Sequence, residues 1–410
     1  MRPVHVEEVV DEGGVLVVRA GEGFWRARAL VNATGTWTHP FLPYYPGVEA
    51  FEGEQFHAAH YPGPEHFRGK RVLVVGGGAS AVQFPGALRP SPTRCGRRGA
   101  SPSGATKKEV IMFAQTPHPD SLKKRSQEEL LAPDTHMGAV ELLVRNLDRM
   151  VDYYNDGVQL DVLEHSGDTA VLGKNGRKVL TLKQGKDLPR ASRRGAGLYH
   201  TAVLFETPEE LAQSVLSTAQ KAPGLFTGTG DHLYSEAFYF DDPEGNGVEL
   251  YVDRPRDTWV RDPSGLLALA TDPLDPNAFL QRHLPAAPLA SRAKLGHVHL
   301  QVGDIDVARD FYLGVLGFEA QGEIPTALFV SAGGYHHHMA LNTWNSAGAG
   351  PRAASLGLGR VDIDVPTDDD LKALEVRLRD HRIPTQNDGR TLSFEDPWKT
   401  AIKVKVAEEA

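Results

Sequence analysis

The C-terminal two thirds of the chain repeat one order of hydrophobic and polar positions. A strand-like run at 197–205 (GLYHTAVLF) precedes a helical pattern at 208–219 (PEELAQSVLSTA), and three further strand-like runs end at 242–253 (DPEGNGVELYVD). Apolar positions with a period of two are typical of a half-buried strand, and spacings of three and four are typical of an amphipathic helix. The pattern therefore predicts a unit of one strand, one helix and several strands.

This unit recurs along the chain. Matching positions in VRNLDRMVDYY (144–154) and VGDIDVARDFY (302–312) are 158 residues apart, and each half contains two units of about 60 residues. A unit of that size cannot bury a curved sheet face alone, so we expect an α+β fold of four βαβββ modules that pair into two open barrels. The matched pairs are Gly138 and Gly296, Val144 and Val302, Leu147 and Ile305, Asp148 and Asp306, and Tyr154 and Tyr312.

The same pattern divides the chain into five parts. A Gly- and Pro-rich α/β region covers 1–88, and the stretch 89–108 contains six Lys or Arg residues and no acidic residue. Such a stretch buries too little apolar surface to offset its loss of conformational entropy, so we expect a disordered basic linker over 89–131. A first barrel domain is expected at 132–255 and a second at 293–407, with a Pro- and Asp-rich connector at 256–292.

Composition and charge narrow the class of protein. The chain has 410 residues, and 44 Lys and Arg against 53 Asp and Glu give a net charge of −9, whereas a general nucleic-acid binder needs a basic face. No apolar run reaches the length of about 18 residues that a membrane span requires, and residues 1–20 do not resemble a signal peptide. The single cysteine, Cys95, fits a reducing compartment. We therefore expect a cytoplasmic protein without nucleic-acid or membrane partners.

A glycine motif stands out in the N-terminal region. An apolar run at 72–75 leads into Gly76, Gly78 and Ala81, which have the G-x-G-x-x-A spacing of a turn that binds a dinucleotide pyrophosphate at a helix N-terminus. An ordinary Gly-rich turn would have the same sequence. Together with ALVNATGTW (29–37), PYYPGVEAFEG (43–53) and FHAAHY (56–61), the motif resembles the flavin-dependent monooxygenase family over residues 4–88.

The resemblance to that family is incomplete. It implies that the glycine motif is the NADPH-binding turn of a truncated Rossmann-like fragment. The FAD-binding strand and turn with which the family begins have no counterpart before residue 30, and Pro85 interrupts the expected helix. We therefore expect only vestigial NADPH binding, no FAD site and no monooxygenase activity.

The segment 230–251 (GDHLYSEAFYFDDPEGNGVELY) carries the most specific motif. It matches in full, at fixed spacing, the signature of extradiol ring-cleaving dioxygenases. The DPEGN turn reverses the chain and leaves Glu249 on the following strand, where it is expected to point into the curved sheet. A solvent-exposed Glu249 and a histidine in a loop at His232 are the structural alternative. The matched positions are Gly230, His232, Phe238, Tyr239, Asp242, Pro243, Gly245 and Glu249.

The rest of 132–407 is similar to the vicinal-oxygen-chelate superfamily, and in particular to bacterial four-module catechol 2,3-dioxygenases. The similarity rests on APDTHMGAVEL (132–142), GLYHTAVLF (197–205) and SAGGYHHHMALNTW (331–344). It implies that two histidines from first strands and a glutamate from a last strand hold one metal ion and leave open positions for a catecholate and O2. Fe(II) is the expected ion, and Mn(II) fits the same donors. On this basis His200 and Glu249 are expected metal ligands.

The third ligand is open between two histidines. The 158-residue offset places the family's ligand position at His297 in the third module and at Ala139 in the first. His136 lies three residues earlier and faces the other side of the strand unless a bulge at Gly138 re-aims it. Lys403 takes the position of the glutamate in the fourth module, so modules three and four cannot complete a site alone. Either His136 completes a site in the first pair of modules, or His297 completes it because modules two and three pair.

The resemblance implies an Fe(II)-dependent catechol 2,3-dioxygenase that cleaves a small aromatic diol with O2. His232 would act as an acid or base beside the bound oxygen. Tyr239 would donate a hydrogen bond to a substrate oxygen or, alternatively, only pack the barrel. Two other functions stay open: a glyoxalase-like metalloenzyme and a non-catalytic binding barrel of bleomycin-resistance type. Assembly into a homo-oligomer is also open.

The run of His336, His337 and His338 offers further nitrogen donors. On a strand, alternate side chains face opposite sides, so only His336 and His338 could share one centre. We interpret the run as a histidine-lined strand near the pocket or at a subunit interface.

Overall fold

The computed structural model describes residue 66, residue 115, residues 117–407 and six short strands between residues 8 and 75. The chain divides into two compact units, Met1–Ile111 and Met112–Ala410. In the first unit, β1, β2 and β3 pair antiparallel, and β4 lies between β5 and β6 with parallel pairing. These strands are β1 (Glu8–Asp11), β2 (Leu16–Ala20), β3 (Gly23–Ala27), β4 (Leu30–Asn32), β5 (Gln55–His57) and β6 (Leu73–Val75).

The predicted dinucleotide-binding turn directly follows β6. Gly76, Gly78 and Ala81 lie outside the described residues, so NADPH binding at this turn stays a prediction. The predicted linker also lies outside the described residues up to residue 114.

The end of the expected linker, residues 117–131, is folded within the second unit. Nε of the buried Arg309 donates a hydrogen bond to Oγ of Ser121 (3.1 Å), and the backbone N–H of His118 donates to the buried Glu323 carboxylate (3.2 Å). The expectation of disorder is therefore wrong for this end of 89–131, because buried polar groups elsewhere in the chain bind it. Its two short 3-10 turns are η4 (Pro119–Ser121) and η5 (Gln127–Glu129).

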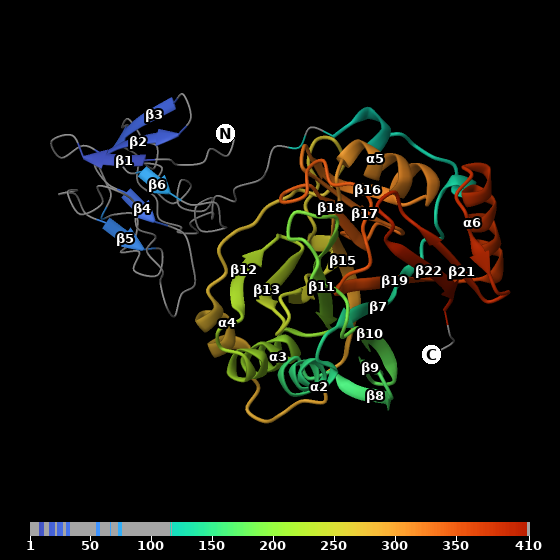
Figure 1. Cartoon of the computed structure of the whole chain (residues 1–410), viewed down its shortest axis with the longest axis horizontal. Coiled ribbons are helices and arrows are strands. Elements are labelled where there is room, and N and C mark those ends of the chain that lie inside the picture. The colour runs from blue at the N-terminus through green and yellow to red at the C-terminus, as the bar shows by residue number, and fades with distance from the viewer. Residues whose placement is uncertain are drawn as a thin grey trace, which may run out of the picture. The chain divides into compact units, whose positions relative to one another are not determined.

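Two eight-stranded sheets form the second unit (Figure 1). One sheet has the order β20-β21-β22-β19-β7-β10-β9-β8, and the other has the order β12-β13-β14-β11-β15-β18-β17-β16. The first sheet contains β7 (His136–Val144), β8 (Asp161–Ser166), β9 (Thr169–Lys174), β10 (Arg177–Gln184), β19 (Gly357–Val365), β20 (Gln386–Asn387), β21 (Thr391–Glu395) and β22 (Ala401–Val406). The second sheet contains β11 (Gly197–Phe205), β12 (Phe226–Asp231), β13 (Ser235–Asp241), β14 (Gly247–Asp253), β15 (Ala293–Gln301), β16 (Glu319–Ile324), β17 (Ala327–Ser331) and β18 (Met339–Asn342).

Each sheet joins two modules through their first strands. Within a module the first and last strands are parallel neighbours, such as β11 and β14, whereas the two modules of a sheet meet through an antiparallel pair, β7 with β19 or β11 with β15. The predicted α+β fold of four modules in two open sheets is confirmed. Each sheet combines one module from the expected domain 132–255 with one module from the expected domain 293–407. Module one shares a sheet with module four, and module two shares a sheet with module three.

Helices of the repeated unit cover the sheets, and α3 lies on the sheet of β11 and β14. The predicted helix at 208–219 is α3 (Pro208–Lys221): Oγ1 of Thr207 accepts a hydrogen bond from the N–H of Glu210 (3.2 Å), and Leu211 and Val215 face the core. No helix among those described is long and apolar enough to cross a membrane. The other α-helices are α2 (Leu147–Asp152), α4 (Pro276–His283), α5 (Ile305–Arg309) and α6 (Asp368–Asp380).

Gly296 occupies a crowded position in β15. The register between β11 and β15 shifts opposite this residue, between Ala202 and Val203. A Cβ atom at Gly296 would overlap the hydroxyl oxygen of Tyr251 and would lie 2.9 Å from Cβ of Leu204. The position therefore accepts glycine only, and the next residue of the strand is His297.

We expect Gly296→Ala to lower the free energy of unfolding by about 1–3 kcal/mol, because the added methyl group must displace Tyr251 or the strand itself. Denaturant-induced unfolding measures this loss. Gly314→Ala is the matched control, since a Cβ atom there meets nothing within 4 Å, and it should change the stability by less than about 1 kcal/mol. Equal losses in the two variants would contradict the steric explanation.

Candidate metal centre

Three neighbouring strands place three of the predicted ligands side by side. In the register of the sheet, Ala202 of β11 lies between Glu249 of β14 and His297 of β15. His200 precedes Ala202 by two residues, and side chains two residues apart on a strand point to the same face. The three side chains therefore meet on one face of the sheet, here called the inner face, while α3 lies on the other.

The side chains of these residues converge at hydrogen-bonding distance. Oε2 of Glu249 lies 2.9 Å from Nε2 of His200 and 3.1 Å from Nε2 of His297. The two Nε2 atoms are 3.3 Å apart. All three residues are buried, with exposed fractions of 6% for His200, 3% for Glu249 and 1% for His297. A carboxylate at this depth needs charged or hydrogen-bonding partners, which the two imidazoles supply.

The protonation states suit a metal site. Burial alone would raise the pKa of Glu249, but electrostatic attraction and hydrogen bonds from His297 and His200 hold it well below its usual value. Burial lowers the pKa of His297 to about 4, against the attraction of the Glu249 carboxylate. At neutral pH the site therefore contains an ionised carboxylate beside a neutral imidazole, and these are the forms that bind metal ions.

The donor atoms fit a divalent cation. Neutral imidazole carries a proton on one nitrogen and a lone pair on the other. Nδ1 of His297 is buried and has no hydrogen-bond partner among the described residues, while its Nε2 faces both His200 and Glu249. Two imidazole nitrogens and one carboxylate oxygen on one side of an ion are the donor set of Fe(II) sites with open coordination positions, and Mn(II) accepts the same donors.

His232 and Tyr239 form a hydrogen-bonded pair beside this site. Nδ1 of His232 lies 2.9 Å from the carbonyl oxygen of Ala270, which fixes the proton on Nδ1. Nε2 of His232 is then an acceptor for the Tyr239 hydroxyl group at 2.8 Å. Tyr239 is the register partner of Glu249. Burial and the Glu249 charge raise the pKa of Tyr239 well above its usual value, so the phenol stays protonated.

His136 lies apart from the other predicted ligands. It begins β7, which belongs to the sheet of modules one and four. The register between β7 and β19 shifts between Met137 and Val140, so the bulge considered at Gly138 is present. The two groups of His and acidic side chains in the described residues that could hold a metal ion do not include His136. The group with His200 and Glu249 is completed by His297 instead.

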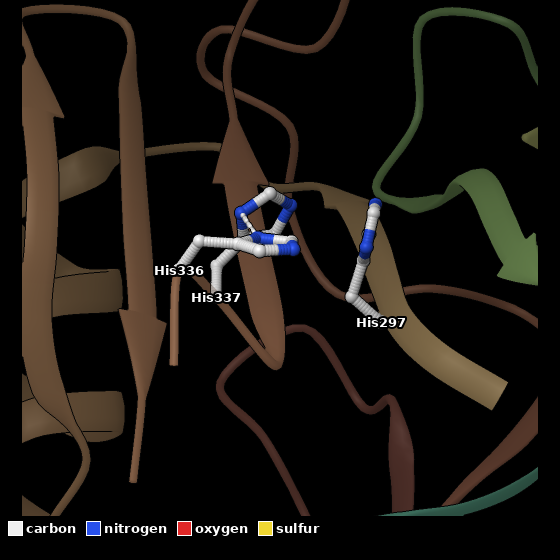
Figure 2. Close-up of side chains that lie close together, drawn as sticks. All are labelled: His297, His336 and His337. Atoms are coloured by element: carbon white, nitrogen blue, oxygen red, sulfur yellow. Dashed lines mark hydrogen bonds between the residues drawn. The ribbon is translucent and has the colours of Figure 1, made fainter. Parts of the chain in front are cut away.

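His336 and His337 both lie close to His297, which strand alternation does not predict. Figure 2 shows the three imidazoles together, and their nitrogen atoms lie within 4.8 Å of one another. Nδ1 of His336 and Nδ1 of His337 are 2.9 Å apart, and Nε2 of His336 is 2.9 Å from Asp253. The assumption of a strand is wrong here, because His336–His338 form a loop before β18.

The two residues that could have indicated this loop are glycines. Gly333 and Gly334 have φ angles of 60° and 67°, a left-handed conformation that strands do not adopt. Only Tyr335 separates the pair from the histidine run, so a Gly-Gly turn signal was present in the sequence. With a turn at this point, neighbouring histidines are able to face the same side.

Similarity to known proteins covers the four modules. Residues 136–250 and 294–404 match the Glyoxalase/Bleomycin resistance protein/Dioxygenase superfamily. Catechol-2,3-dioxygenase of Bacillus subtilis is 34% identical over 273 residues, which span 64% of this chain and 94% of that protein. A putative dioxygenase of Bacillus subtilis with a solved structure aligns with a TM-score of 0.47 at 12% identity, over 67% of this chain and 86% of that one.

The N-terminal fragment is similar to other proteins. Residues 26–89 match the Flavin-binding monooxygenase-like family. Human flavin-containing monooxygenase 1 is 46% identical over 58 residues, which are 14% of this chain and 11% of that protein. The predicted resemblance of this region to a fragment of a flavin monooxygenase is therefore confirmed, and the fragment spans a small part of such relatives.

We expect the metal-free chain to bind one Mn(II) ion, and Glu249→Gln to weaken that binding at least about tenfold, because a neutral amide replaces the one charged donor. Calorimetric titration with Mn(II) measures the affinity. His136→Gln is the control and should bind Mn(II) like the unchanged chain. Loss of binding in His136→Gln together with full binding in Glu249→Gln would contradict this assignment.

Proposed function

This chain belongs to the glyoxalase/bleomycin resistance protein/dioxygenase superfamily, and on that basis we propose that it is a metal-dependent extradiol dioxygenase. Its substrates would be a small catechol-type aromatic diol and O2. One observation carries the proposal: His200, Glu249 and His297 converge on the inner face. The hydrogen-bonded pair of His232 and Tyr239, which belongs to the signature segment 230–251, lies beside them.

His200, His297 and Glu249 would hold the ion, with Fe(II) proposed and Mn(II) compatible with the same donors. When bound, such an ion supplies neighbouring open positions for the two diol oxygens and for O2. The protein holds one donor on each of three adjacent strands, so the geometry is fixed by the sheet and not by mobile loops. The carbon–carbon bond beside the diol would break, and both oxygen atoms of O2 would enter the product.

The chain supplies the proton acceptor that the diol needs. His232 keeps its proton on Nδ1 through the Ala270 carbonyl group, so its Nε2 lone pair is available on the inner face. A diol hydroxyl group that takes the place of the Tyr239 hydroxyl can pass its proton to this nitrogen. Tyr239, which stays protonated, can then donate a hydrogen bond to a substrate oxygen.

Buried aromatic rings keep water from one side of the site. Tyr251 lies 4.9 Å from His297 between ring centroids, and its hydroxyl group bonds that of Tyr335 at 2.8 Å. Tyr234 stacks on His336 at 4.7 Å. These groups are buried in the described structure, so the inner face offers an apolar wall for a flat aromatic substrate.

The alternatives remain glyoxalase-type chemistry and a binding barrel without catalysis. A glyoxalase-type site usually has a second carboxylate, and the described group around His200 and His297 contains only Glu249. A barrel that merely binds an apolar ligand has no need of a buried carboxylate held by two imidazoles. Both observations favour the dioxygenase.

The decisive experiment uses the full chain loaded anaerobically with Fe(II). We expect catechol and air to give one O2 consumed per yellow ring-fission product, and His200→Ala and Glu249→Ala to abolish both signals. His232→Asn should lower kcat by about a hundredfold or more, because it removes the proton acceptor. His165→Asn, an exposed histidine on β8, is the control and should leave the rate unchanged.

The outcomes separate the three functions. A chain that binds metal but takes up no O2 would contradict the dioxygenase function and favour glyoxalase-type chemistry. A chain that binds neither Fe(II) nor Mn(II) would be a binding barrel.

A further inference from the structure

A basic groove opens between the two sheets of the second unit. It has a volume of about 1260 Å³ and is lined by seven Lys and Arg residues but only three Asp and Glu residues. The whole chain, in contrast, has a net charge of −9. Three of the cations, Arg190, Arg193 and Arg194, come from the exposed segment that connects β10 to β11.

The cations of this segment are available to a ligand. Arg190, Arg193 and Arg194 form no salt bridge in the described part of the chain, although the charge of Arg193 acts on the Asp241 carboxyl and opposes the rise of its pKa on burial. The acidic residues of the groove are in part already bonded: the Glu244 carboxylate accepts hydrogen bonds from the backbone N–H groups of Arg145 (2.9 Å) and Asn146 (2.8 Å). The groove therefore has a surplus of positive charge that its own carboxylates do not neutralise.

The groove continues into the inner face that carries the metal donors. Asp241 lines it and follows Tyr239 by two residues on β13, and Gln301 lines it and follows His299 by two residues on β15. Residues with this spacing share a face. The arginine-lined groove therefore borders the inner face, and none of the three metal donors is among its lining residues.

Aromatic rings of the groove lie beside the imidazoles of the inner face. Tyr199 lines the groove, and its ring centroid is 5.3 Å from that of His200 and 4.9 Å from that of His299. Trp344 also lines the groove and lies 5.1 Å from Tyr199. Tyr199 therefore contacts both the groove and the imidazole ring of the metal donor His200.

We propose that this groove selects aromatic diols that carry a carboxylate, with Arg190, Arg193 and Arg194 as specificity-determining residues. The inference rests on the proposed function, because it places the diol end at the metal donors. Guanidinium groups bind carboxylates through paired N–H donors and attract anions over a distance. A diol without a charge has no partner at this end of the surface.

The test compares two diols of similar size, 3,4-dihydroxyphenylacetate and the neutral 4-ethylcatechol, with the Fe(II)-loaded full chain. We expect kcat/KM to favour the acid at least about tenfold at low ionic strength and less at high ionic strength. The triple variant Arg190→Gln/Arg193→Gln/Arg194→Gln should lose this preference and keep the rate on 4-ethylcatechol within about twofold.

A control variant removes the same number of positive charges from a part of the surface outside the groove. Lys123→Gln/Lys124→Gln/Arg379→Gln changes three exposed cations that do not line the groove, and it should keep the preference for the acid. Equal kcat/KM values for the two diols in the unchanged chain, or an equal loss of preference in both triple variants, would overturn the proposal while leaving the dioxygenase function intact.

Binding without turnover gives an independent measurement. The acid 4-hydroxyphenylacetate has the same carboxylate but lacks the second hydroxyl group, so calorimetry can follow its binding alone. We expect the arginine triple variant to bind it at least about tenfold more weakly than the unchanged chain. Binding of this acid through the arginines in a chain that cleaves no diol would refute the proposed function but keep the anion site. Equal competition by inorganic phosphate would overturn the assignment to carboxylates.

Discussion

The buried charge of Glu249 is the constraint on which the rest of the site depends. An ionised carboxylate with 3% of its surface exposed is stable only if groups of the protein replace its water. His200 does so from β11, which pairs with β14, and His297 does so from β15, the next strand beyond β11. The pairing of these strands brings the imidazoles to the buried carboxylate. The glycine beside His297 allows β15 to pass Tyr251, so it contributes to the same stabilisation of the Glu249 charge.

The sheet of modules one and four has the same arrangement of strands but no buried carboxylate at the position of Glu249. In its register Arg360 and Lys403 take the places of His200 and Glu249. Arg360 forms ion pairs with Glu141 (3.2 Å) and with Asp362 (2.6 Å), so paired charges occupy the position that His200 has in the other sheet. The repeat itself is preserved in detail, since two buried tyrosines at equivalent positions each bond a buried aspartate of the following module, Tyr154 to Asp242 and Tyr312 to Asp396. Among the described residues, the groups that could hold a metal ion therefore lie in the sheet of modules two and three and in the loop before β18.

Local sequence predicted most of the site, and long-range pairing decided the rest. His232, Tyr239 and Glu249 lie within 18 residues of one another, so a fixed spacing and one turn suffice to bring them together. The choice between His136 and His297 depends on which modules share a sheet. The first strand of every module contains apolar residues that can pack in a sheet, and this pattern alone does not specify the partner strand. The histidine run before β18 departs from strand alternation for a different reason, because two glycines turn the chain just before it.

The nested order of the modules has a consequence for how the chain reaches this structure. His200 and His297 are 97 residues apart in the sequence, whereas the pairing of β7 with β19 joins residues more than 200 positions apart. Closing a longer loop costs more conformational entropy, and the inner closure shortens the outer one. The strands that carry the candidate metal donors therefore cost less conformational entropy to bring together than β7 and β19, whose pairing depends on the longer closure.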